Sequence, residues 1–193
     1  MIEEQKNREE GRGAAAELIR RAQAGDSTAF DQLIVAHQRR ALGLAWRLLG
    51  NAEDASDATQ EAFLRVFRHL DKFDASLDFA GWLYRIVVNA CNDLARRRGS
   101  RFSSYEAALE SGALAEPASP HDVESAAMAA EEQARILRAL AQLTEKERAA
   151  IVLRDLEGLP TEEVARILGS SPTTVRSQIS SARVKLRAFR EKR

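Results

Sequence analysis

The chain has few of the residues that build covalent or metal-bound frameworks. Its single cysteine, Cys91, excludes a disulfide within the chain and a cysteine-rich zinc site. Its three histidines, His37, His69 and His121, lie far apart and lack the spacing of metal ligands. We therefore expect neither a metal site nor a cofactor.

Long apolar runs are also missing. No stretch approaches the roughly 20 apolar residues that a membrane-spanning helix needs, and the charged N-terminus lacks the apolar core of a signal peptide. We expect a soluble, cytoplasmic protein without membrane insertion.

The sequence contains no glycine-rich phosphate-binding loop, nucleophile motif or paired metal ligands, so we predict that it has no catalytic residues and is not an enzyme.

Strand patterns are nearly absent, whereas apolar residues recur with a helical period among abundant Ala, Leu, Arg and Glu. This composition predicts an all-α protein. Residues 1–24 form an N-terminal extension with one short helix, and residues 25–98 form a first helical domain. Asp26 or Ser27 can cap the first long helix of this domain, and Asn51 can cap the next.

The run from Thr161 to Arg183 predicts two helices joined by a tight turn. Gly169 can take the left-handed conformation that ends the first helix, and Ser171 can cap the second. Apolar residues at spacings of four, three and four predict the buried stripe of the second helix, namely Val175, Ile179, Ala182 and Leu186. The polar residues between them should point outward, as on a helix that enters a DNA major groove: Thr173, Thr174, Arg176, Ser177, Ser180, Ser181 and Arg183.

The formal net charge of zero hides an uneven distribution. From residue 176 to the end, seven basic residues oppose one acid, whereas seven acids oppose one basic residue over residues 103–135. A one-sided basic cluster on a predicted recognition helix favours binding to nucleic acid. We interpret residues 99–134 as a flexible acidic linker and residues 135–193 as a second helical domain that ends in the helix-turn-helix.

These features together resemble the sigma-70 family of bacterial RNA polymerase sigma factors, and within it the two-domain extracytoplasmic-function (ECF) group. The resemblance rests on residues 51–63 and 82–89 in the first domain and on residues 143–154 and 161–183 in the second. It implies that the first domain is the region 2 helical bundle, which binds core polymerase and recognises and melts the −10 element. The second would be the region 4 helix-turn-helix domain, which recognises the −35 element.

Asp57, Gln60 and Glu61 stand at i, i+3 and i+4, so a helix presents them on one face. The resemblance implies that this patch docks on the clamp helices of the polymerase β′ subunit. The alternative is an ordinary solvated face, with acids placed near a helix N-terminus where the helix dipole favours them.

The segment from Phe73 to Asn89 resembles the family's −10 reader, in which a loop holds a flipped base. The resemblance and the chemistry of unstacked bases indicate these candidates: Phe73, Ser76, Asp78, Phe79, Asn89, Arg96 and Arg97. The two phenylalanines can instead hold the loop in place. The arginines can neutralise phosphates, or simply be solvated at a helix end that favours positive charge.

On the predicted recognition helix, Arg176 is the best candidate for a bidentate contact to guanine, with Ser177 beside it for a base edge or a phosphate. Thr173 and Thr174 stand at the helix start, where phosphate contacts are common. The full set of −35 candidates is Thr173, Thr174, Arg176, Ser177, Ser180 and Arg183.

The partners implied are core RNA polymerase, through its β′ clamp helices and β flap, and promoter DNA. An anti-sigma factor that clamps the two domains is also compatible with this organisation. The acidic linker either threads the polymerase cleft or serves as a charged tether.

Two rival functions are an autonomous helix-turn-helix regulator, which needs a dimerisation element or ligand pocket, and an interaction module that titrates a regulator and has lost DNA binding.

Overall fold

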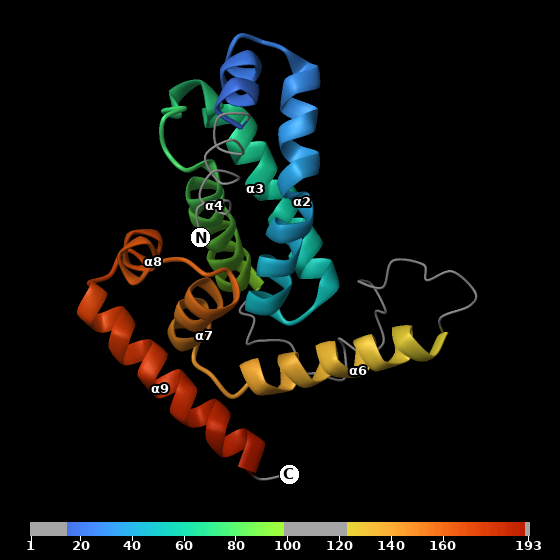
Figure 1. Ribbon diagram of the computed structural model, residues 1–193, viewed down its shortest axis with the longest axis vertical. Helices are drawn as coiled ribbons and strands as arrows, with labels where there is room; N and C mark the ends of the chain where they lie inside the picture. The colour runs from blue at the N-terminus through green and yellow to red at the C-terminus, as the bar shows by residue number, and fades with distance from the viewer. Residues whose placement is uncertain (1–14, 99–122, 192–193) are drawn as a thin grey trace, which may run out of the picture.

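The computed structural model describes residues 15–98 and 123–191, and every regular element in these two ranges is helical. A short helix over residues 15–23 comes first. It is followed by α2 (Ser27–Leu49), α3 (Ala52–His69), the 3-10 turn η1 (Leu70–Lys72) and α4 (Phe79–Arg98). Helices α2, α3 and α4 pack against one another in the upper half of Figure 1. The all-α prediction is confirmed for the described residues.

Local capping residues determine where the helices of this first group begin and end. The Asp26 carboxylate accepts a hydrogen bond from Ala29 N at 3.1 Å and caps α2. Gly50, at φ 84°, ends α2 in the left-handed conformation that glycine adopts without strain. Asn51 Oδ1 then accepts a hydrogen bond from Asp54 N at 2.7 Å and caps α3. The sequence predicted both caps.

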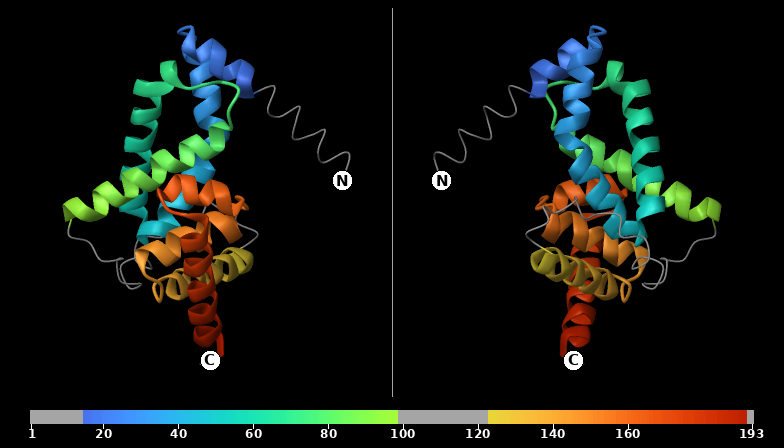
Figure 2. Two further views of the ribbon diagram at one scale, coloured as in Figure 1. Left: turned by 90° about the vertical axis from the view of Figure 1, so that its left-hand side faces the viewer. Right: turned by 90° about the vertical axis from the view of Figure 1, so that its right-hand side faces the viewer.

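The remaining helices form a second group. They are α6 (Val123–Leu140), α7 (Glu145–Ile151), the π-helical turn η2 (Val152–Leu156), α8 (Thr161–Leu168) and α9 (Pro172–Glu191). Figure 2 shows that α9 extends away from the other helices toward the C-terminus. The predicted boundary at residue 135 lies inside α6, and the linker prediction for residues 99–122 lies outside the described residues, as does the extension over residues 1–14.

The prediction of the −10 loop was wrong at its C-terminal end. The sequence pattern placed residues 73–81 in the loop and began the next helix at Trp82, whereas α4 begins at Phe79. The reason is that Asp78 caps the helix, because its Oδ2 accepts a hydrogen bond from Gly81 N at 2.9 Å. The loop is therefore shorter, and Asp78 closes it.

The two helix groups pack directly against each other, and their buried apolar side chains form one continuous cluster. Glu157, after η2, pairs through Oε1 with Arg47 Nη1 of α2 at 3.0 Å. The Arg148 guanidinium donates to the carbonyl oxygen of Leu48 at 3.0 Å. The sequence predicted two domains, but it did not predict this contact between them. Among the described helices, none has the length and apolar character needed to span a membrane.

Candidate protein and nucleic-acid interfaces

The acidic patch predicted on α3 is present on one face of that helix. Asp57 and Gln60 are exposed, and Glu61 is partly exposed. Glu61 Oε1 accepts a hydrogen bond from Arg65 Nε at 2.8 Å, and Arg65 Nη1 pairs with Asp93 Oδ2 of α4 at 2.9 Å. The hydrogen bond from Arg65 lowers the pKa of Glu61, so this carboxylate is ionised at neutral pH. The ion pairs hold the patch firmly against α4.

Two apolar residues that the sequence analysis did not assign to any site continue this face. Leu64 follows Glu61 by three residues and is 50% exposed, and Phe67 is 67% exposed. The Phe67 ring makes an edge contact with Phe30 of α2, with ring centroids 5.3 Å apart. Large exposed apolar side chains that gather beside charged ones mark contact surfaces. The spacing of Leu64 from Asp57 and Glu61 could have indicated it.

The aromatic side chains around the −10 loop lie inside the protein. Phe73 is 7% and Phe79 is 4% exposed. Their rings lie 5.7 Å apart, and the Phe73 ring lies 4.6 Å from that of Trp82. These edge-to-face and tilted ring contacts hold both ends of the loop against the helices, so a contact of either phenylalanine with DNA needs the loop to move.

The tip of the loop is exposed and shaped by a turn. The Asp74 carboxylate accepts a hydrogen bond from Ser76 N at 2.9 Å, and its carbonyl accepts one from Leu77 N at 2.9 Å. Ser76 is exposed at this tip. A cavity of about 520 Å³ lies beside the loop. Its lining combines Trp82 with basic residues (His69, Lys72, Arg85 and Arg166) and with acids (Asp74, Asp78 and Glu163).

Asn89, Arg96 and Arg97 are all exposed on α4. Asn89 and Arg96 line a cleft of about 830 Å³ whose opposite wall includes Thr174 and Gln178 of α9. Residues predicted for the −10 and −35 elements therefore face each other across one cleft. Arg96 also forms an ion pair with Asp93.

The helix-turn-helix forms as the sequence predicted. Gly169 ends α8 at φ 58°, in the left-handed conformation. Ser171 Oγ accepts a hydrogen bond from Thr174 N at 3.1 Å and caps α9. Val175, Ile179 and Ala182 are buried, and Leu186 is half-buried. All six −35 candidates are exposed: Thr173, Thr174, Arg176, Ser177, Ser180 and Arg183.

Two of these candidates have acidic partners. Arg176 Nη2 lies 3.2 Å from Glu162 Oε1 of α8, and both side chains are largely exposed. Arg183 forms a bidentate pair with Asp155, at 2.8 and 3.1 Å. The hydrogen bonds that Arg183 donates to Asp155 raise the pKa of Arg183. Since a bidentate pair is the more specific of the two arrangements, Arg176 is the arginine more easily released to a base.

The prediction that Ser181 faces outward was wrong. Ser181 is half-buried, and its Oγ donates a hydrogen bond to Glu147 Oε1 of α7 at 2.5 Å. The apolar spacing defines only the centre of the buried stripe, whereas α7 packs against a wider part of α9 and covers Ser181. Ser181 therefore does not belong to the exposed face.

A helical bundle with a charged and apolar exposed stripe, packed on a helix-turn-helix whose second helix is exposed and basic, is the architecture of a two-domain DNA-binding protein. Comparison with known families makes this more specific. The models for sigma-70 region 2 and sigma-70 region 4 match residues 33–101 and 133–186.

Similar proteins agree with both matches. The RNA polymerase sigma-H factor of Pseudomonas aeruginosa is 36% identical over 171 residues, which cover 86% of this chain and 89% of the relative. The ECF RNA polymerase sigma-E factor of Escherichia coli is 38% identical over 174 residues, with 86% and 88% covered. The structure of CnrH in complex with the cytosolic domain of CnrY superposes with a TM-score of 0.69 at 30% identity, and the match covers 93% of this chain and 98% of that one.

The chain belongs to the sigma-70 family and is a sigma factor of the ECF group. As a sigma factor, it binds core RNA polymerase and directs promoter-specific initiation of transcription by recognising −10 and −35 elements. This finding favours the sigma-factor prediction over an autonomous helix-turn-helix regulator.

Proposed function

We propose that the two helix groups divide the promoter between them. Residues 25–98 bind core polymerase and open the −10 element, and residues 135–193 bind the −35 element. The observation that carries this division is the exposed face of α9, where all six −35 candidates lie on a capped helix with no acid among them. Such a face fits the major groove.

The docking surface for core polymerase is the stripe on α3 formed by Asp57, Gln60, Glu61, Leu64 and Phe67. Its acids supply charge complementarity to a basic partner, and its exposed apolar side chains supply the area that becomes buried. The clamp helices of the β′ subunit are the proposed partner. The second helix group contacts the β flap.

For the −10 element, the proposed contacts are the loop tip at Ser76 and the exposed residues of α4, Asn89, Arg96 and Arg97. The cavity beside the loop has an aromatic wall together with basic and acidic side chains, so an unstacked base could lie against Trp82 with its phosphate toward the basic residues. Phe73, Asp78 and Phe79 give the loop its shape, since the first and last are buried and Asp78 caps α4.

For the −35 element, Arg176 and Ser177 read base edges, and Thr173 and Thr174 position the helix on phosphates. Ser180 and Arg183 complete the contact surface. The two elements are centred roughly 25 base pairs apart, which is about 85 Å at 3.4 Å per base pair. Since Asn89 and Arg96 share one cleft with Thr174, the two helix groups must separate before both elements are bound.

The proposal also covers the cellular location of the chain, its lack of chemistry of its own and its regulation by a partner. The chain works in the cytoplasm and leaves all chemistry to the polymerase. An anti-sigma factor that holds the two helix groups together is a further proposed partner, supported by the similar CnrH, which was solved with the cytosolic domain of CnrY.

A footprint of the complete holoenzyme on promoter DNA tests this division. Permanganate should detect unpaired thymines at the −10 element, and cleavage reagents should show protection of the −35 duplex. Arg176→Ala should weaken protection at −35 and leave the thymines reactive on promoters that still bind. Loss of −10 opening with intact −35 protection in that variant would contradict the assignment.

A further inference from the structure

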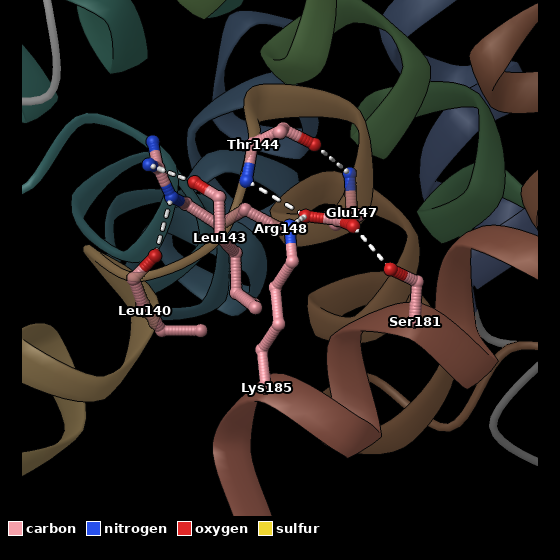
Figure 3. Close-up of polar contacts among 7 residues, drawn as sticks. All are labelled: Leu140, Leu143, Thr144, Glu147, Arg148, Ser181 and Lys185. Carbon is pink, nitrogen blue, oxygen red and sulfur yellow. Dashed lines mark hydrogen bonds and ion pairs between the residues drawn. The ribbon is translucent and has the colours of Figure 1, made fainter. Parts of the chain in front are cut away.

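The carboxylate of Glu147 lies between α7 and the recognition helix α9 (Figure 3). Within α7 it forms a capping box, because Thr144 N donates to Glu147 Oε2 at 2.9 Å and Glu147 N donates to Thr144 Oγ1 at 3.4 Å. A capping box satisfies two backbone donors at a helix start. A cap alone would leave the second carboxylate oxygen to solvent.

Two side chains of α9 use the same carboxylate. Ser181 Oγ donates to Glu147 Oε1 at 2.5 Å, and Lys185 Nζ donates to Oε2 at 2.7 Å. Ser181 and Lys185 are four residues apart, so they extend from consecutive turns on one side of α9. Figure 3 shows both reaching from α9 toward Glu147. One acid thus attaches α9 to α7 at two points.

The surroundings make these contacts strong. The Glu147 side chain is only 10% exposed, whereas Lys185 is 41% exposed, so water reaches the ammonium end of this ion pair but little of the carboxylate. Burial by itself would raise the pKa of Glu147. The hydrogen bonds from Lys185, Ser181 and Thr144 outweigh burial and lower this pKa to about 2. The carboxylate is therefore charged whenever the protein binds DNA at neutral pH.

The two attachment points determine how α9 is turned about its axis. The buried stripe of Val175, Ile179 and Ala182 holds the helix by apolar contacts, which have no directional preference. Hydrogen bonds, in contrast, depend on direction. At 3.6 residues per turn, Ser181 lies about 140° around the helix from Arg176. Holding Ser181 therefore sets the direction in which Arg176 points.

We propose that Glu147 is a positioning residue for recognition of the −35 element. It acts through Ser181 and Lys185, which set the rotation of α9, and it does not touch DNA. The proposal rests on the assignment of α9 to the −35 element. It assigns Lys185, which is half-exposed, to the contact between α9 and α7 and not to a phosphate.

The test uses holoenzyme formed from core polymerase and the full chain on a promoter library randomised at −35. Glu147→Gln removes the charge, and the double variant Ser181→Ala, Lys185→Met removes the contacts with α9 but keeps the capping box. Glu145→Gln is the matched control, since Glu145 lies in the same turn and is exposed. In both test variants, the ratio of transcription from the best to that from the worst −35 sequence should fall by about threefold or more. In the control this ratio should stay unchanged.

Several outcomes decide the proposal. If Glu147→Gln fails to fold, the double variant still tests the proposal. A cooperative thermal unfolding transition checks that the double variant is folded. An unchanged ratio in the double variant, or an equal loss on every −35 sequence, would overturn the proposal. So would a salt dependence reduced by about one counterion, because that would place Lys185 on a phosphate. A wild-type chain without any −35 preference would instead refute the assignment of α9, and the positioning role with it.

Discussion

Tyr84 of α4 donates a hydrogen bond from Oη to Glu157 Oε2 over 3.0 Å, across the boundary between the two helix groups. The Glu157 side chain is 9% exposed, and its other oxygen pairs with Arg47. Burial, followed by the charge of Glu157, raises the pKa of Tyr84 to about 12, so the phenol stays protonated and remains a donor. This contact joins α4, which carries residues proposed to read the −10 element, to the helix group proposed to bind the −35 element.

Tyr84→Phe should favour the open arrangement of the two helix groups. The variant loses a hydrogen bond to a charged group, which contributes about 1.5–3 kcal/mol. Fluorescence transfer between a label on α2 and one on α9 should show a larger distance, while each group stays folded. A double-mutant cycle with Glu157→Gln should give a coupling energy well above zero. Additive effects would contradict the contact.

Arg176→Ala should lower transcription from promoters that carry the preferred base pair at one −35 position. The free energy that separates this base pair from the others at that position should fall by about 1–3 kcal/mol. The ion pair of Arg176 with Glu162 is exposed, so its loss contributes little to stability. Glu162→Gln is the control, and it should retain the base preference. If Arg176→Ala instead weakens all −35 sequences equally, Arg176 contacts a phosphate.

Leu64→Ala and Phe67→Ala should each weaken binding to core polymerase by about 1–2 kcal/mol, since exposed apolar side chains at the centre of a contact carry much of its energy. Binding of a fluorescently labelled chain to core polymerase measures this loss. Leu77→Ala is a matched control, because Leu77 is 61% exposed but lies in the loop assigned to DNA and not on the stripe of α3. Equal losses in the control and the test variants would show that the stripe on α3 is not the docking surface.

Acid should destabilise the second helix group through Glu147. The pKa of Glu147 falls from an ordinary 4.5 to about 2 in the folded chain, so the folded state holds the charged form more tightly than the unfolded state does. This stabilisation is complete above pH 4.5 and is lost as the pH falls toward 2. Urea unfolding of wild type and Glu147→Gln between pH 2 and 6 measures it. The difference in unfolding free energy between the two should shrink toward low pH; a constant difference would contradict the account.

Local features of the helices could be predicted from the sequence. Asn51, Gly169 and Ser171 act within a few residues of their own position, so their capping roles follow from residue type and spacing. The buried stripe of α9 follows from helical periodicity for the same reason. Most of the candidate site, including the exposed −35 face, therefore came from local patterns and from the family resemblance.

Contacts between distant segments could not be predicted in this way. Tyr84 and Glu157 are separated by 73 positions, and nothing in the neighbourhood of either indicates the other. Ser181 was misplaced because periodicity finds the centre of a buried face but not its width. The start of α4 was misplaced because Asp78 suited two functions, a polar loop residue and a helix cap, and only the Gly81 hydrogen bond distinguishes them.

Run-off transcription with core polymerase on a promoter library, with and without the full chain, tests the central claim most directly. The account predicts that the chain directs initiation from a subset of promoters that share −10 and −35 sequences, and that core polymerase alone selects none of them. Sequence-specific binding of the folded chain to duplex DNA, without any change in the start sites chosen by the polymerase, would contradict it.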